Sequence, residues 1–204
     1  DDVVRDLVRA AGFGHLVVAD SDGLASTPMP FVVDDDLGSV RAHLARPNPV
    51  WKVAPCDALL LVPVTDAYIS PGWYPSKAAH GEVVPTWNYE VVHLYGRLVA
   101  HDDADWVRRQ ITELTDANEA ALAAPWAVTD APESFIARMQ RGIVGHERIV
   151  DRVVAKRKLS QNRSSDDAIG AIAGLRREGT RGAAAVAASM ATAVGDTTTD
   201  PGSR

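Results

Sequence analysis

Residues 87–100 read WNYEVVHLYGRLVA and form the longest segment of strand-like alternation in the chain. Successive side chains of a β-strand point to opposite faces, so every second residue shares a face. The odd-numbered positions from Trp87 to Arg97 would carry aromatic and polar side chains on one face, whereas Asn88, Val92 and Leu94 would lie on the other. The alternation predicts a long strand at the centre of a sheet.

Shorter strand-like segments surround this one. They are HLVVA at 15–19, PFVVD at 30–34, residues 40–44, ALLLVPV at 58–64 and a returning strand at 142–159. A helix is expected near the N-terminus, a helical block over 103–142 behind the acidic stretch HDDAD, and another helix over 166–179. Grouped strands followed by helices predict an α+β fold, mainly antiparallel β: a barrel with helices packed outside.

The expected domain organisation is simple. A single domain is predicted over residues 1–177, with the helical block 103–142 inside it. From residue 178 the chain becomes rich in alanine and then reads GDTTTDPGSR. This composition predicts a frayed helix and a flexible C-terminal tail over 178–204.

Composition excludes several classes of protein. The chain has 204 residues, 46% of them hydrophobic, and a formal net charge of -6. An acidic balance argues against a general nucleic-acid surface, because phosphate binding needs a basic face. A membrane span needs about 18 consecutive apolar residues, and no such run exists. Cys56 is the only cysteine, so an internal disulfide is impossible and a reducing cytoplasm is the expected location.

The stretch YISPGWYPSKAAHGEVVPTWNY, residues 68–89, gathers unusually many flat and polar side chains. Trp73 and Trp87 offer stacking area, Ser70 and Asn88 offer hydrogen bonds, and Lys77 offers a charge for a phosphate or carboxylate. Apolar bulk with a few convergent polar groups is typical of ligand pockets. The alternative is a corner between two strands whose aromatic side chains fill the core.

Two further stretches carry candidate polar groups. In RAHLARPNPVW, residues 41–51, His43 lies on a predicted strand, and Arg46 follows it with a planar fork suited to an anion. Lys158 belongs to a cluster of basic residues in the segment KRKLSQNR, residues 156–163. This segment is either an exposed basic loop or a site for an anionic cofactor. Six histidines offer iron ligands or proton shuttles, although each also reads as a structural residue.

Five motifs together resemble the PaiB-like family of FMN-binding negative transcriptional regulators. They are RAHLARPNPVW, YISPGWYPSK, VVPTWNYEVVHLYGRL, PWAVTDAPESFI and KLSQNR, and the resemblance covers most of residues 1–175. It implies the flavin-binding split β-barrel and a homodimer that holds its cofactor near the subunit interface. The residues that it places in the site are Arg46, Ser70, Trp73, Lys77, Trp87, Asn88 and Lys158.

One branch of PaiB-like proteins, the piperazate synthases, uses haem to close N5-hydroxy-L-ornithine into L-piperazic acid by forming an N–N bond. The sequence departs from the common family pattern at Pro28, where the family has histidine, at His146, which replaces phenylalanine, and at Arg157, which replaces an aromatic residue. An extra histidine and an extra cation suit haem, which needs an axial ligand and partners for two propionates. Residues 73–89 stay close to the ordinary pattern, which favours FMN.

Three hypotheses follow. The first is a haem b enzyme of the piperazate synthase type that acts on a small amino-acid substrate. The second is an FMN-binding regulator or flavoprotein in which Arg46, Lys77 and Lys158 hold the phosphate. The third is a module that represses transcription through a partner, although no helix-turn-helix with a basic recognition helix is visible.

Residue roles follow from the haem hypothesis. His43 is the first choice as iron ligand and His146 the second. Lys77 and Asn88 are the predicted catalytic residues. The predicted cofactor-binding residues are His43, Arg46, Ser70, Trp73, Trp87 and Lys158.

Overall fold

The computed structural model describes residues 2–197, with side chains to residue 195, and contains a seven-stranded sheet flanked by helices. Its strands are β1 (Phe13–Asp20), β2 (Gly23–Pro30), β3 (Val32–Val33), β4 (Ser39–Ala45), β5 (Cys56–Ile69), β6 (Thr86–His101) and β7 (Ile143–Lys158). The α-helices are α1 (Asp2–Ala11), α2 (Pro75–Ala79), α3 (Ala104–Glu119), α4 (Glu133–Gln140), α5 (Ser165–Glu178) and α6 (Arg181–Thr197). Short 3-10 turns are η1 (Pro49–Val53), η2 (Pro71–Trp73) and η3 (Val128–Asp130).

The strand order is β2-β1-β5-β6-β7-β4-β3. The pairs β1–β2, β1–β5, β3–β4 and β4–β7 are antiparallel. This arrangement confirms the predicted mainly antiparallel α+β class. The hairpin between β1 and β2 turns at residues 20–23, where Asp20 pairs with Gly23.

The described chain divides into two compact units. Unit 1 comprises residues up to 62 together with 92–154, and unit 2 comprises residues 63–91 together with those from 155 onward. This division differs from the single domain predicted over residues 1–177. The reason is that β5, β6 and β7 each begin in one unit and end in the other. The sequence shows such a strand as one uninterrupted apolar pattern.

Strand β6 has the alternation that the sequence predicts. The side chains of Asn88, Val92 and Leu94 are fully buried, whereas the odd-numbered side chains from residue 87 to residue 97 are exposed or half-buried. Gly96 interrupts the apolar face because a Cβ atom there would collide with the main-chain carbonyl oxygen of Ile149. The close approach of β7 to β6 therefore requires glycine at this position.

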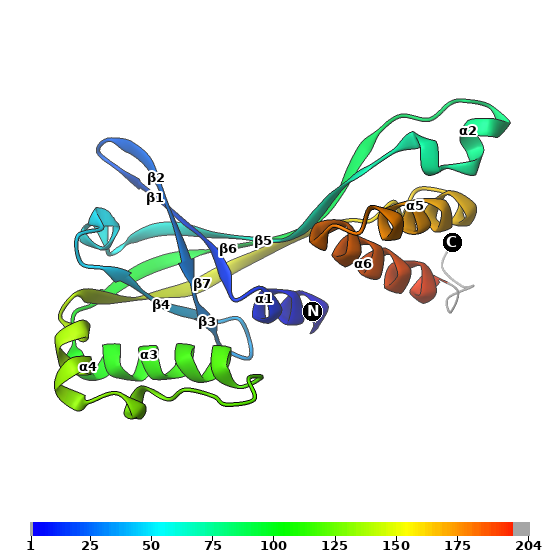
Figure 1. The fold of residues 1–204 in the computed structure, drawn as a ribbon. Coiled ribbons are helices and arrows are strands. Elements are labelled where there is room, and N and C mark those ends of the chain that lie inside the picture. Colours follow the sequence, from blue (N-terminus) through cyan, green and yellow to red (C-terminus); the bar gives the residue numbers. More distant parts are fainter. Residues whose placement is uncertain (1, 198–204) are drawn as a thin grey trace. The chain divides into compact units, whose positions relative to one another are not determined.

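In unit 1, helix α3 lies along β3 and β4 (Figure 1). Asp103 caps the helix by accepting a hydrogen bond from the main-chain N–H of Trp106 at 2.7 Å. The side chains of Val107, Gln110 and Leu114 are buried at helical spacing. The helix therefore packs this stripe against the unit, as its apolar periodicity predicts.

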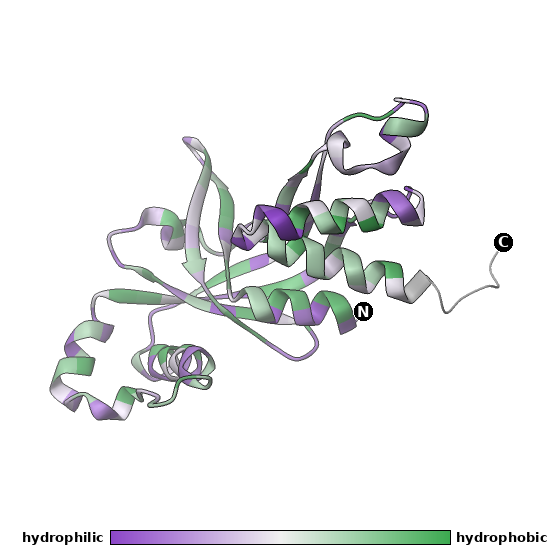
Figure 2. Ribbon diagram, turned by 45° about the vertical axis from the view of Figure 1, so that its right-hand side comes forward, coloured by the Kyte–Doolittle hydropathy of each residue, from purple (hydrophilic) through white to green (hydrophobic). Residues whose placement is uncertain are grey.

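In unit 2, helices α5 and α6 pack side by side on an apolar cluster. The buried members of the cluster are Ala67, Ile69, Tyr74, Leu159, Ala171, Ile172, Leu175, Ala183, Val186, Ala187 and Met190. Figure 2 shows α6 in pale green over most of its length, as its alanine-rich composition requires.

Residues 181–195, within the segment predicted as a frayed helix and a flexible tail, form most of α6 and pack into the apolar cluster of unit 2. Ala183, Val186, Ala187 and Met190 recur at helical spacing and are buried. Alanine is the strongest helix former, so the small side chains favour the helix while this stripe buries it. Residues 198–204, the rest of the predicted tail, lie outside the described residues.

Candidate functional site

His43 and His146, the two candidate iron ligands, lie on opposite faces of the β4–β7 pair. The register sets His43 against Gly145 and Ala42 against His146, and neighbouring pairs point to opposite sides of a sheet. One face is covered by α3 and carries His43, whereas the other face is the buried interior of unit 1 and carries His146. The two imidazoles therefore cannot ligate the same iron from one subunit.

His43 contacts a buried side-chain amide through one ring nitrogen. Its Nδ1 atom lies 2.7 Å from Oε1 of Gln110, a buried side chain of α3. With the proton on Nδ1, this contact is a hydrogen bond to the amide oxygen and Nε2 keeps its lone pair, while the amide nitrogen of Gln110 is buried without a partner among the described residues. Among the described residues, Nε2 has no hydrogen-bond partner. A histidine that ligates a metal is oriented in the same way, by a hydrogen bond from its other ring nitrogen.

His146 is in a different state. Its side chain is only 1% exposed, and neither ring nitrogen has a hydrogen-bond partner among the described residues. Burial, together with the nearby His43 and Arg148, lowers the pKa of His146 to about 3, so the imidazole is neutral. Arg148 shares this interior face and donates from Nη1 to the carbonyl oxygen of Ala58 at 2.8 Å. Its Nε and Nη2 atoms have no partner among the described residues.

Arg46 is engaged by protein groups. Its Nη1 and Nη2 atoms donate to the carboxylate of Asp102 at 3.0 and 2.5 Å. Nε donates to the carbonyl oxygen of Arg141, and Nη2 also donates to that of Ile143. These bonds hold the pKa of Asp102 below its usual value. The guanidinium thus ties the end of β4 to the neighbouring segments, and an anion would have to displace Asp102.

Three predicted residues belong to the β5–β6 connection in unit 2. Ser70 caps η2 by accepting a hydrogen bond from the N–H of Gly72 at 3.1 Å. Trp73 packs so closely on α5 that a Cβ atom at Gly174 would overlap its ring. Ser70 and Trp73 therefore have structural roles here, whereas Lys77 is exposed at the last turn of α2.

Asn88 joins β6 to the segment after β7, and Lys158, the last residue of β7, bonds to the first residue of β6. The fully buried amide of Asn88 donates to Oγ of Ser160 at 2.9 Å and also contacts the sulfur of Met190. Lys158 donates from Nζ to Oγ1 of Thr86 at 2.6 Å. Ser160 has a φ of 65°, in the left-handed region that non-glycine residues seldom adopt. The hydrogen bond from Asn88 helps to hold this turn.

Trp87 lies on the opposite face of β6 from Asn88. Its side chain is 53% exposed and meets the ring of Tyr68 edge to face, with 6.2 Å between the ring centroids. Of the residues predicted to bind a cofactor, Trp87 presents the most open aromatic surface.

The predicted residues are divided between the two units. His43, Arg46 and His146 belong to unit 1, whereas Ser70, Trp73, Lys77, Trp87, Asn88 and Lys158 belong to unit 2.

The sequence also missed two polar residues. Gln110 orients His43, and nothing in the helical pattern around it distinguishes it from a solvent-exposed glutamine. Glu90 is buried on β6, where its carboxylate accepts from Nε of Arg157 and from Oγ of Ser189, each at 2.6 Å. The role of Glu90 could have been inferred from the sequence, because this charged residue stands at an even-numbered position of β6, where its neighbours are buried.

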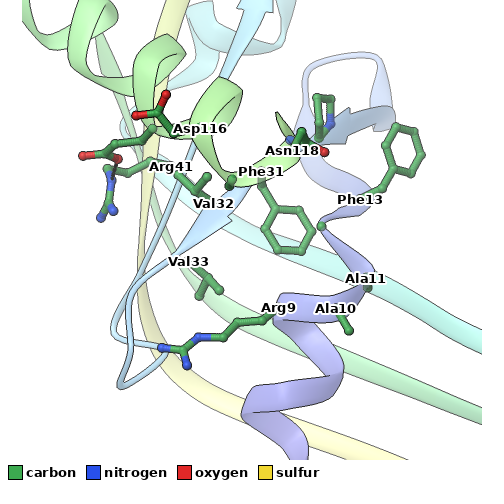
Figure 3. A pocket seen from close by; sticks show the side chains of 14 residues that line it. Arg9, Ala10, Ala11, Phe13, Phe31, Val32, Val33, Arg41, Asp116 and Asn118 are labelled. Carbon is green, nitrogen blue, oxygen red and sulfur yellow. Dashed lines mark hydrogen bonds and ion pairs between the residues drawn. The ribbon is translucent and has the colours of Figure 1, made fainter. Parts of the chain in front are cut away.

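The largest cavity described in unit 1 has a volume of about 780 Å³ and lies between α1, β3, β4 and α3 (Figure 3). Phe31, Val32 and Val33 supply apolar walls, and Arg41 lines the cavity beside Asp116. Arg41 is paired with Glu113 at 3.0 Å and with Asp34 at 2.5 Å. The carboxylate of Asp116 has no partner among the described residues.

This cavity adjoins the His43–Gln110 pair. Arg41 and His43 share a face of β4, while Gln110 and Glu113 lie one turn apart on α3. The hydrogen bonds Arg41–Glu113 and His43–Gln110 are therefore neighbours along one line of contact between the strand and the helix.

Within residues 2–197, no helix is both long and apolar enough to span a membrane. The same residues contain no group of three or more His, Cys, Asp or Glu side chains arranged to hold a metal ion.

A family model described as "Putative FMN-binding domain" matches residues 1–152. Protease synthase and sporulation protein PAI 2 of Bacillus subtilis is 30% identical, over 86% of this chain and 84% of its own length. An uncharacterized protein of Emericella nidulans is 30% identical, with 87% of each chain covered.

Solved structures share the fold at low sequence identity. The FAD and haem binding protein of Mycobacterium smegmatis matches with a TM-score of 0.58 and 15% identity, over 83% of this chain and 77% of its own. A flavocytochrome of Azotobacter vinelandii matches with a TM-score of 0.54 and 15% identity, over 78% and 67%. These likenesses confirm the predicted split barrel of the flavin-binding type.

Proposed function

Since the chain belongs to the PaiB-like family of FMN-binding proteins, we propose that it is a haem-binding member that forms the N–N bond of L-piperazic acid from N5-hydroxy-L-ornithine. The observation that carries the proposal is the His43–Gln110 pair. In the tautomer that donates from Nδ1 to the buried amide of Gln110, the Nε2 lone pair has no protein partner among the described residues.

His43 would be the residue that holds haem iron. Such a histidine binds the metal through one ring nitrogen and donates a hydrogen bond from the other. Nδ1 of His43 lies beside the amide of Gln110, which leaves Nε2 for iron, whereas His146 has no acceptor to orient it and faces the interior of unit 1. Haem iron, when bound, would supply a centre that accepts the hydroxylamine and weakens its N–O bond.

The cavity beside Arg41 suits the amino-acid substrate. Its lining charges, Arg9 and Arg41 against Glu113 and Asp116, sum to zero, which matches a zwitterion. The unpaired carboxylate of Asp116 can receive an ammonium group, and Phe31 and Val33 can contact methylene carbons. Holding both nitrogens of one substrate in place favours ring closure over reaction with water. The N–N bond forms as the N–O bond breaks, and the hydroxide leaves as water with a proton from the substrate amine.

The predicted catalytic roles are less well supported by the contacts. Asn88 is fully buried and bonded to Ser160, so its amide has no free group to offer a substrate. Lys77 is exposed and remains available as a proton donor.

The first test is the visible spectrum of protein produced with both a haem precursor and riboflavin supplied. We expect a Soret band that is lost in His43→Ala and restored by added imidazole, which replaces the missing ligand. Gln110→Leu should retain haem but shift the band, because Nδ1 of His43 loses its hydrogen-bond acceptor. His146→Leu is the matched histidine control and should keep the Soret band. Haem retained at full occupancy in His43→Ala would refute the ligand assignment.

FMN is the second candidate, favoured by the family match over residues 1–152 and by the exposed indole of Trp87. Of the predicted phosphate ligands, Arg46 is paired with Asp102 and Lys158 with Thr86, so Lys77 is the cation that remains free for a phosphate. A yellow protein whose two visible bands bleach on reduction, with no Soret band, would support FMN and overturn the haem proposal. The homodimer expected from the family is also proposed, and light scattering in solution would test it.

A further inference from the structure

An aromatic corner in unit 2 has side chains that the proposed chemistry does not use. Tyr68 on β5 and Trp87 on β6 are 46% and 53% exposed, and their rings meet at an interplanar angle of 71°. Two large rings that stand nearly perpendicular and remain open to water form two walls of a recess. Exposed aromatic surface of this kind is unfavourable unless something covers it.

The recess is a real cavity with an apolar floor. Its volume is about 240 Å³, and Leu175 lies at its base among the buried residues of the unit 2 cluster. This volume accommodates a small head group rather than a cofactor of the size of FMN or haem. The rim carries Asp66, Glu178 and Thr180.

The charges at the rim are uncompensated. Asp66 and Glu178 are exposed, and neither carboxylate has a hydrogen bond or ion pair among the described residues. Glu178 is also the last residue of α5, where the helix presents the negative end of its dipole. Arg176, Arg177 and Arg181 lie close to Glu178 in the sequence but do not line the recess.

We propose that this recess binds a small organic cation, an alkylammonium head group, between Tyr68 and Trp87. A cation over an aromatic face is attracted by the ring quadrupole, and tryptophan is the strongest such partner. The apolar floor contacts the alkyl groups, while Asp66 and Glu178 balance the charge. The inference goes beyond the proposed N–N bond formation and does not depend on it.

The same charges argue against a flavin phosphate in this recess. Two carboxylates at the rim would repel an anion, and Lys158 donates to Thr86, which is on the face of β6 opposite to Trp87. The recess therefore selects for positive charge, and its ligand is chemically distinct from either cofactor.

Titration calorimetry on the full chain can test this with choline and its neutral isostere 3,3-dimethyl-1-butanol. The two probes have the same shape and differ in charge. We expect choline to bind and the alcohol not to bind. Trp87→Leu should weaken choline binding about tenfold, because it removes one ring from the cation. The double variant Asp66→Asn with Glu178→Gln should weaken it as well.

The matched control is Glu82→Gln with Asp166→Asn, which removes two exposed carboxylates of unit 2 that do not line the recess. Choline affinity should be unchanged in this control, and all variants should keep the wild-type melting temperature because the altered side chains are exposed. Equal affinity for the two probes, no heat from choline at about 10 mM, or equal weakening in the control would each overturn the proposal. The Soret band of wild-type protein should not respond to choline, which separates this site from the haem site.

Discussion

Protonation of His146 should make the protein markedly less stable in mild acid. Its imidazole is buried without a hydrogen-bond partner among the described residues, and its pKa is lowered from 6.5 to about 3. At pH 5 the unfolded chain binds a proton on this group and the folded chain does not. Stability therefore rises with pH through this window and is lost as pH falls below about 6.5.

The size of the effect follows from the two pKa values. Between pH 7.5 and pH 5.0 the linkage relation gives a loss of about 2 kcal/mol in the free energy of unfolding. Urea unfolding at both pH values measures this loss, and comparison with His146→Leu isolates the contribution of the imidazole. Leucine has a similar volume and does not titrate, so the variant should be at least as stable as wild type at pH 7.5 and relatively more stable at pH 5.0.

An exposed residue that does not titrate provides the control. Val84→Leu should follow the wild-type pH profile, because neither side chain binds a proton. The reasoning fails if the difference in stability between wild type and His146→Leu is the same at pH 7.5 and pH 5.0. That result would mean that the folded protein accepts the proton without cost, for example through an acceptor that becomes available in solution.

Three further predictions concern stability and can be checked by chemical unfolding at pH 7.5. Gly96→Ala should lower the free energy of unfolding by about 3 kcal/mol, because the added Cβ atom would collide with main-chain atoms of β7. Gly195→Ala is the control and should be neutral or stabilising, because a Cβ atom there meets no atom within 4 Å. Asn88→Ala should cost about 1–3 kcal/mol, because it leaves the buried hydroxyl of Ser160 without its partner; no change would mean that water replaces the amide. Lys77→Ala should change stability by less than about 0.5 kcal/mol, so a larger loss would reveal a contact made by this exposed side chain.

The sequence was sufficient for most strands and most helices because their patterns are local. It did not predict β2, because GLASTPMP contains two prolines and little apolar alternation. Strict alternation around Val92 and Leu94 identifies a strand with one buried face, and the buried spacing of α3 identifies a helix. The short helix α2 was missed, since five residues within a stretch rich in proline and aromatics give no periodic signal. For α6 the composition predicts a frayed helix but not its packing, because alanine-rich sequence indicates helix propensity and not the partner surface that buries Val186 and Met190.

The candidate site was harder to predict because it depends on pairs of residues far apart in the chain. The prediction that His43 lies on a strand is confirmed, but its contact with Gln110 arises from packing between residues 67 positions apart in the sequence. Arg46 was expected to face an anion, and the anion it meets is the carboxylate of Asp102. Whether an arginine such as Arg46 binds a ligand or forms an internal ion pair depends on the tertiary structure. A short sequence motif does not specify this.

Unit 2 is formed by two segments that are far apart in the sequence, and this affects its folding during translation. Ile69 and Tyr74 leave the ribosome early, but the side chains that cover them, including Leu175 and Met190, come about a hundred residues later. At about 5–20 residues per second, translation leaves this apolar surface unpaired for roughly 5–20 s. During that interval the exposed apolar surface of the nascent chain can bind chaperones. A chain that ended at residue 158 would leave this surface permanently exposed.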